Sequence, residues 1–118
     1  MNLTTTAALL TILAFSGAAH DDIPQPSRTI EVHAHRFAFE PAEITVKQGE
    51  TVRLELVSDD VPHSLVVKEL GIDETASKAH PGDVDFKATQ AGDFAGRCGR
   101  FCGAGHGHMT FTVHVAGE

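Results

Sequence analysis

The chain has 118 residues, of which 42% are hydrophobic and 21% are charged, and its formal net charge is −7 with the histidines neutral. This length allows one domain with a modest core, and the composition excludes a disordered tail. An acidic chain without a basic cluster is not a nucleic-acid-binding protein, and its charge favours a basic partner. Because the chain has seven phenylalanines but no tryptophan or tyrosine, any aromatic patch must consist of phenylalanine.

The first predicted segment is a secretory signal peptide over residues 1–19. It has no charged side chain, and its apolar run ends in the small residues 16–19, which are typical of a signal-peptidase site. An uncleaved N-terminal anchor is the alternative, and both place the domain in the periplasm or elsewhere outside the cytoplasm. Residues 20–28 contain Pro24 and Pro26 and are predicted to form a linker, followed by one domain over residues 29–118.

Within the predicted domain, apolar and polar residues alternate with a period of two, which indicates β-strands rather than helices. Four of the alternating runs are centred on Val32, Val46, Leu54 and Leu65, and the last extends over residues 109–115. We expect a turn at residues 48–49 and a loop over residues 76–82. Short strands separated by Gly, Pro and Asp predict an all-β sandwich or barrel.

Segment 98–109, with the sequence CGRFCGAGHGHM, gathers metal-binding side chains in the loop before the last predicted strand. Its thiols, imidazole and thioether are soft or borderline ligands that together favour copper. These groups belong to Cys98, Cys102, His106 and Met109. His63 begins a predicted strand at the same end of the sandwich and is the candidate for a remote ligand. One cysteine suffices for a mononuclear blue-copper site, whereas two bridging sulfurs can hold two copper ions.

This loop and the segment around His63 resemble the CuA domain of cytochrome c oxidase subunit II. The residues that carry the resemblance are Asp60, Val61, His63, Ser64, Cys98, Cys102, Gly103, His106 and Met109. The patterns Phe37-x-Phe39-x-Pro41 and Gly49-Glu50-x-Val52 resemble the wider cupredoxin superfamily. The resemblance covers about residues 29–116 and implies a cupredoxin-like Greek-key β-sandwich.

The resemblance also implies a ligand set for two copper ions. Cys98 and Cys102 would bridge both ions, and His63 and His106 would bind one ion each. Met109 and the backbone carbonyl of Arg100 would be weak ligands. Such a site would transfer single electrons, because full protein ligation leaves no open position for a substrate. We therefore expect no enzymatic activity from the chain by itself, although it could be a subunit of a cytochrome c oxidase-type oxidoreductase.

Three features differ from the family pattern. Arg100 occupies a position where oxidase members usually carry a glutamate that serves a neighbouring metal site, and the exposed tryptophan that often receives electrons is missing. Phe101 or Phe94 is a possible substitute for it. Arg97 and Arg100 should favour the reduced form of the cluster. The two-helix membrane hairpin of the family is not found, so we expect a free or singly anchored domain whose redox partner is a cytochrome c or a membrane oxidase.

Several alternatives remain open at this point. Cys98 and Cys102 can form a disulfide, as is common outside the cytoplasm, or Cys98 can be incidental to a mononuclear cupredoxin site. The same ligands would serve a periplasmic copper carrier or assembly factor, or a periplasmic metal buffer. His33 and His35 are expected at the surface, with weak metal binding as their alternative role.

Overall fold

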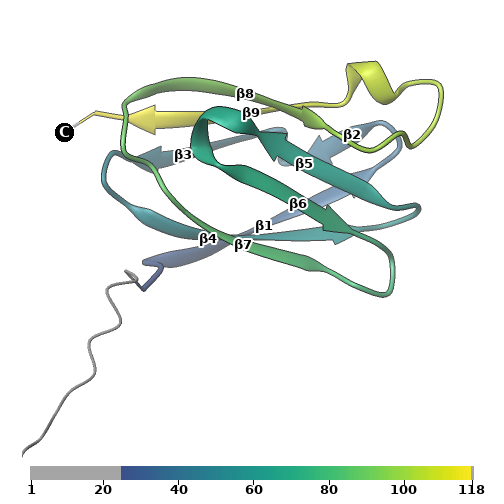
Figure 1. Cartoon of the computed structure of the whole chain (residues 1–118), viewed down its shortest axis with the longest axis horizontal. Helices are drawn as coiled ribbons and strands as arrows, with labels where there is room; N and C mark the ends of the chain where they lie inside the picture. Colours follow the sequence, from purple (N-terminus) through teal and green to yellow (C-terminus); the bar gives the residue numbers. More distant parts are fainter. Residues whose placement is uncertain (1–24, 118) are drawn as a thin grey trace, which may run out of the picture.

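Nine strands form in residues 25–117, the part of the chain that the computed structural model describes (Figure 1). The strands are β1 (Arg28–His35), β2 (Ala38–Glu40), β3 (Glu43–Lys47), β4 (Thr51–Ser58), β5 (His63–Val67), β6 (Ile72–Ala76), β7 (Gly82–Lys87), β8 (Gly92–Cys98) and β9 (Thr110–Ala116). Two single turns of 3₁₀-helix, η1 (Lys68–Leu70) and η2 (His106–His108), complete the regular structure. The predicted signal peptide and the first part of the predicted linker, residues 20–24, lie outside the described residues.

The strands form two sheets that pack face to face (Figure 1). One sheet has the order β2-β1-β4-β7 and the other has the order β3-β9-β8-β5-β6. The pairs β1–β4 and β3–β9 are parallel, and all other pairs are antiparallel. The predicted all-β sandwich is therefore confirmed. Among the described residues, no helix has the length and apolar character needed to span a bilayer.

The hydrophobic core lies between the two sheets, because each strand turns its apolar residues inward. Val32 and Leu54 of one sheet and Leu65 of the other are fully buried. Phe39 and Phe111, from opposite sheets, meet edge to face with their ring centroids 5.9 Å apart. Complete burial of such a side chain stabilises the fold by about 1.5–3 kcal/mol, so these contacts stabilise the packing of the two sheets.

Every strand predicted from alternation is present within a residue or two of its expected position. Residues Met109, Phe111, Val113 and Val115 are buried, whereas the residues between them are exposed or half-buried. The alternating runs do not predict β2, β6, β7 or β8. Strand β6, for example, is apolar only at its ends and presents polar residues between Ile72 and Ala76. The expected loop over residues 76–82 begins at the last residue of β6 and ends at the first residue of β7.

The loop between β8 and β9 lies at one end of the sandwich, opposite the C-terminus (Figure 1). Strand pairing places it beside the start of β5, because Cys98 is paired with Leu65 and the N–H of Gly99 donates to the Ser64 carbonyl. The turn between β1 and β2 contacts the same loop through Arg36. Three connections that are distant in sequence thus meet at this end.

Candidate metal centre

The two cysteines are buried and lie side by side as free thiols. Cys98 is the last residue of β8, and Cys102 lies on the loop that follows. Their Sγ atoms are 4.0 Å apart, about twice the length of a disulfide bond. Two metal–sulfur bonds of about 2.3 Å each can span such a gap. The pair is therefore arranged for sharing a soft metal ion.

His63 reaches the cysteines from the first residue of β5 and is completely buried. Its Nε2 lies 2.7 Å from a carboxylate oxygen of Asp60, and its Nδ1 lies 3.9 Å from Sγ of Cys98. Because the carboxylate can only accept, the ring proton of neutral His63 is held at Nε2. The lone pair of Nδ1 then points toward the thiol, which is the orientation that a metal-binding histidine needs.

Asp60 holds this orientation through a carboxylate that accepts three hydrogen bonds. Besides His63, the backbone N–H groups of Arg36 and Val61 donate to it over 2.8 and 2.6 Å. Partial burial alone would raise the pKa of Asp60, but these three hydrogen bonds outweigh it and lower the pKa to about 2. The carboxylate is therefore ionised at any physiological pH and remains an acceptor for His63.

His106 and Met109 approach the other cysteine from the far side of the loop. Nδ1 of His106 and Sδ of Met109 each lie 3.7 Å from Sγ of Cys102. The η2 turn reverses the chain between them, and the carbonyl of Met109 accepts from the N–H of Cys98, which closes the loop. His108 is exposed, so the structure brings His106 rather than His108 to the thiols.

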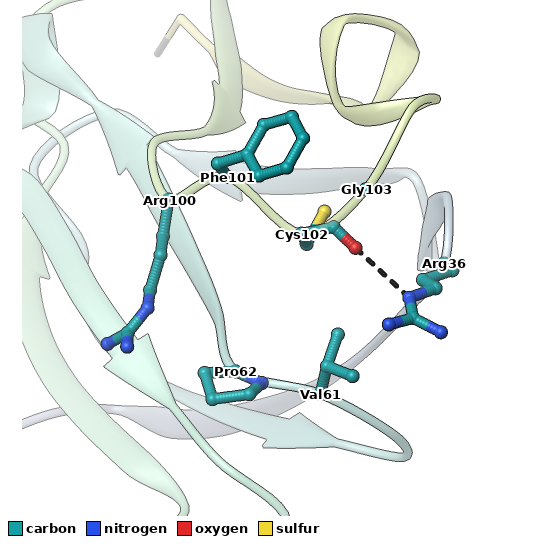
Figure 2. A pocket seen from close by; sticks show the side chains of 7 residues that line it. All are labelled: Arg36, Val61, Pro62, Arg100, Phe101, Cys102 and Gly103. Atoms are coloured by element: carbon teal, nitrogen blue, oxygen red, sulfur yellow. Dashed lines mark hydrogen bonds between the residues drawn. The ribbon is translucent and has the colours of Figure 1, made fainter.

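Arg100 contributes its backbone and not its side chain to this cluster. Its carbonyl oxygen lies 3.1 Å from Sγ of Cys98, whereas its guanidinium extends away from Cys102 along the surface (Figure 2). All six residues that the sequence singled out therefore gather around the two sulfurs. Among the residues of the described part, the ligand atoms of His63, Cys98 and Cys102 form the one compact cluster of this kind, within 4.8 Å of one another.

The chemistry of these donors fits copper. Two thiols, two imidazoles and a thioether are soft or borderline ligands, and the compact cluster found in the described residues includes no Asp or Glu. Burial, and then the neighbouring Cys98, raise the pKa of the Cys102 thiol. The Cys102 thiol is therefore protonated at neutral pH in the metal-free site, and binding of a metal to its sulfur must release that proton.

Two residues that sequence analysis did not assign to the site brace its loop. Nε of Arg36 donates to the carbonyl oxygen of Cys102 over 3.0 Å (Figure 2). The ring of Phe37 packs against the loop so closely that a Cβ atom on Gly103 or Gly105 would lie 2.9 or 2.5 Å from ring atoms. Phe37 belongs to the superfamily pattern noted above, but no sequence signal identified Arg36.

His33 and His35 lie at the surface, as predicted, and so does His114. His33 contacts Asp59 and Glu31, His35 contacts Glu40, and His114 contacts Asp93 and Glu43. No second metal-ligating cluster forms around His33 and His35 in residues 25–117. Of the two phenylalanines considered as electron-entry residues, Phe101 is exposed at 77%, whereas Phe94 is partly buried against the core.

Comparison with known proteins gives a consistent result. The model of a cupredoxin-like domain matches residues 5–111. Cytochrome c oxidase subunit 2 of Cereibacter sphaeroides is 32% identical over 75 residues, which cover 64% of this chain and 25% of that protein. The corresponding subunit of Thermus thermophilus is 29% identical over 87 residues, covering 74% of this chain and 64% of that protein. The chain thus spans less than two thirds of the length of these relatives.

Solved structures show the same fold at low sequence identity. The periplasmic domain of subunit II of the cytochrome oxidase of Bradyrhizobium japonicum superposes with a TM-score of 0.74 at 19% identity, covering 81% of this chain and 88% of that domain. Auracyanin A, a blue copper protein from Chloroflexus aurantiacus, superposes with a TM-score of 0.63 at 17% identity, covering 75% of this chain and 98% of that protein.

Proposed function

This chain belongs to the family of cupredoxin-like domains, and we propose that it transfers single electrons through a dinuclear, CuA-type copper centre. Its resemblance to the copper domain of cytochrome c oxidase subunit II is confirmed by the curated relatives. The buried cluster of His63, Cys98 and Cys102 can bind copper. The number of ions and the role of each ligand belong to the proposal.

The observation that carries the proposal is the pairing of each thiol with its own imidazole. Nδ1 of His63 is 3.9 Å from Cys98, and Nδ1 of His106 is 3.7 Å from Cys102, on either side of a sulfur pair 4.0 Å apart. One tetrahedral ion could take two thiolates and two imidazoles, but the compact cluster within 4.8 Å contains His63 and does not contain His106. Two ions that share the sulfurs would take one imidazole each. The duplicated arrangement therefore supports two ions.

Each residue would then have a distinct role. Cys98 and Cys102 would bridge the ions as thiolates, His63 and His106 would each bind one, and Met109 and the Arg100 carbonyl would be weak ligands. The bound copper pair would supply reversible one-electron chemistry. The rigid sandwich and the brace from Arg36 would keep the ligands in place in both oxidation states, and complete protein ligation would exclude a substrate.

The partners and the location follow from the relatives and are proposals as well. The curated relatives are named as oxidase subunits, which supports a membrane oxidase as the electron acceptor. A cytochrome c or another small redox protein would be the donor. The oxidase-domain structure above is described as periplasmic, which supports a location outside the cytoplasm.

The tightness of copper binding distinguishes an electron-transfer protein from a protein that delivers copper. The reduced chain would be loaded with copper, and bound copper per chain would be measured before and after dialysis against a chelator of moderate affinity. We expect two ions per chain that remain bound. Loss of the copper to the chelator would favour a carrier or assembly factor, and binding well beyond two ions would favour a metal buffer.

A further inference from the structure

A shallow hollow of about 320 Å³ opens on the surface directly over Cys102 (Figure 2). Its rim carries the side chains of Arg36 and Arg100, and its apolar part consists of Val61, Pro62 and Phe101. We call these five residues the arginine–phenylalanine surface. They come from three separate connections, and all of them lie at the end of the sandwich that holds the candidate copper ligands.

The aromatic residue of this surface is unusually exposed. Phe101 is 77% exposed, and in the described part of the chain only Phe37 is another exposed large apolar residue. Phe101 is the residue before Cys102, and its ring centroid lies 5.7 Å from that of His106. A molecule that covered Phe101 would gain apolar burial and would at the same time lie next to two proposed copper ligands.

The charge of this surface is opposite to that of the whole chain. The net charge is −7, yet both charged side chains that line the hollow are arginines. Elsewhere, Arg28 is paired with Glu50 and Arg53 with Asp85. Within residues 25–117, by contrast, neither Arg36 nor Arg100 forms a side-chain ion pair, so both can meet a carboxylate from outside.

Asp60 does not form an ion pair with either arginine of this surface. It lies on the same connection as Val61 and accepts hydrogen bonds from His63 and from the backbone N–H groups of Arg36 and Val61. Guanidinium groups bind carboxylates with matching fork geometry, and arginine and aromatic residues are enriched in protein interfaces. The surface therefore combines an apolar centre with a rim that recognises anions.

We propose that the arginine–phenylalanine surface is the docking site of an acidic redox partner, a protein that presents carboxylates around an apolar contact. The inference rests on the proposed function and makes it more specific. One electron would pass from the reduced copper pair to the oxidised centre of the docked partner, next to Phe101 and Cys102, so that the copper pair is oxidised and the partner is reduced. The net charge alone predicts a basic partner, so the local surface reverses that expectation.

Binding can be tested without any redox reaction. The isotope-labelled, copper-loaded and reduced chain would be titrated with poly-glutamate and, separately, with poly-lysine, and its amide NMR signals would be followed. We expect poly-glutamate to shift the signals of residues 36, 61 and 100–103. Shifts that are confined to other parts of the surface, or no shifts at these positions, would overturn the proposal. A repeat on the metal-free chain keeps the result independent of the copper state.

Electron exchange gives the second test, with hexacyanoferrate(III) as an anionic probe and tris(phenanthroline)cobalt(III) as a cationic one. Each probe takes one electron from the reduced copper pair. The iron(III) or cobalt(III) of the probe is thereby reduced to iron(II) or cobalt(II). We expect the reaction with hexacyanoferrate to slow as the ionic strength rises to about 0.2 M, which is the sign of local attraction. If the net charge of −7 controlled the reaction, salt would screen the repulsion of the anionic probe and the rate would rise. A rate that rises with salt would therefore contradict the proposal.

Matched charge variants locate the effect. Arg100→Gln should slow the reaction with hexacyanoferrate by about two- to fivefold at low salt, the range for one exposed charge pair. Lys87→Gln makes the same charge change beside Gln48, at a different hollow, and should leave the rate unchanged. Equal effects of the two substitutions would refute the docking site. If the NMR shifts appear but no copper-dependent electron exchange occurs, the docking surface stands and the proposed function fails.

Discussion

Arg36 joins the two halves of the candidate copper site, because its side chain donates to the Cys102 carbonyl while its backbone N–H donates to Asp60. Asp60 in turn holds His63. The short turn between β1 and β2 thus contacts the cysteine loop directly and the remote histidine through one carboxylate. This arrangement makes the turn part of the support of the site, although it offers no ligand of its own.

The first prediction concerns the side chain of Arg36. Arg36→Gln removes the hydrogen bond from Nε to the Cys102 carbonyl and frees the loop, and a hydrogen bond from a charged donor contributes about 1.5–3 kcal/mol. We expect copper to dissociate at least about tenfold faster, as measured by transfer to a strong chelator. Arg97→Gln is the control, because it also removes one positive charge near the site but does not remove a hydrogen bond to the Cys102 carbonyl. Equal dissociation rates for both variants would show that the brace has no effect.

The second prediction concerns the packing of Phe37 against the loop. A Cβ atom on Gly105 would lie 2.5 Å from the Phe37 ring, whereas a Cβ atom on Gly107 would meet nothing within 4 Å. Gly105→Ala should therefore lower the free energy of unfolding by about 1–3 kcal/mol, and Gly107→Ala should not. Urea unfolding measures both. Adding Phe37→Leu to Gly105→Ala should recover part of the loss if the clash is the cause.

The third prediction concerns the orientation of His63. Asp60→Asn removes the charged acceptor that fixes the proton at Nε2, and loss of such a partner typically weakens metal binding by about ten- to a hundredfold. Chelator competition would measure this affinity. Asp59→Asn is the matched control, because Asp59 contacts His33 rather than a proposed ligand. An unchanged affinity in Asp60→Asn would refute the orienting role.

The fourth prediction concerns the pH dependence of folding stability through His114, which lies on β9. The pKa of His114 is raised from 6.5, mainly by its hydrogen bond to Asp93 and further by the charges of Asp93 and Glu43. A raised folded-state pKa stabilises the fold below the unfolded pKa of 6.5, and this contribution is lost as the pH rises through the folded pKa. His114→Gln in the metal-free chain should therefore be destabilised relative to wild type at about pH 5.5 and not at about pH 8. A stability difference that is equal at both pH values would contradict this assignment.

Sequence patterns alone predict five of the nine strands and single out the candidate ligands. Strands such as β4 and β9 alternate because one face is buried, and this alternation is visible without a structure. Cys98, Cys102, His106 and Met109 were recognisable because they lie within one short loop, and His63 because it begins a strand at the same end.

The parts that sequence analysis missed depend on contacts between distant segments. Arg36 meets Cys102 across 66 positions, and nothing in its neighbourhood indicates that contact. The local reversal of charge around Phe101 was hidden for the same reason, since Arg36 and Arg100 become neighbours only when β1 and β8 are placed in their sheets. Strand β6 is held by its pairing with β5 rather than by its own pattern.

Electron paramagnetic resonance of the copper-loaded, partly oxidised chain tests the central claim most directly. The two free thiols and their two imidazoles predict one unpaired electron shared by two copper nuclei, with hyperfine structure from both and two ions per chain. A spectrum with hyperfine structure from a single nucleus and one copper per chain would contradict the dinuclear centre and would leave a mononuclear cupredoxin.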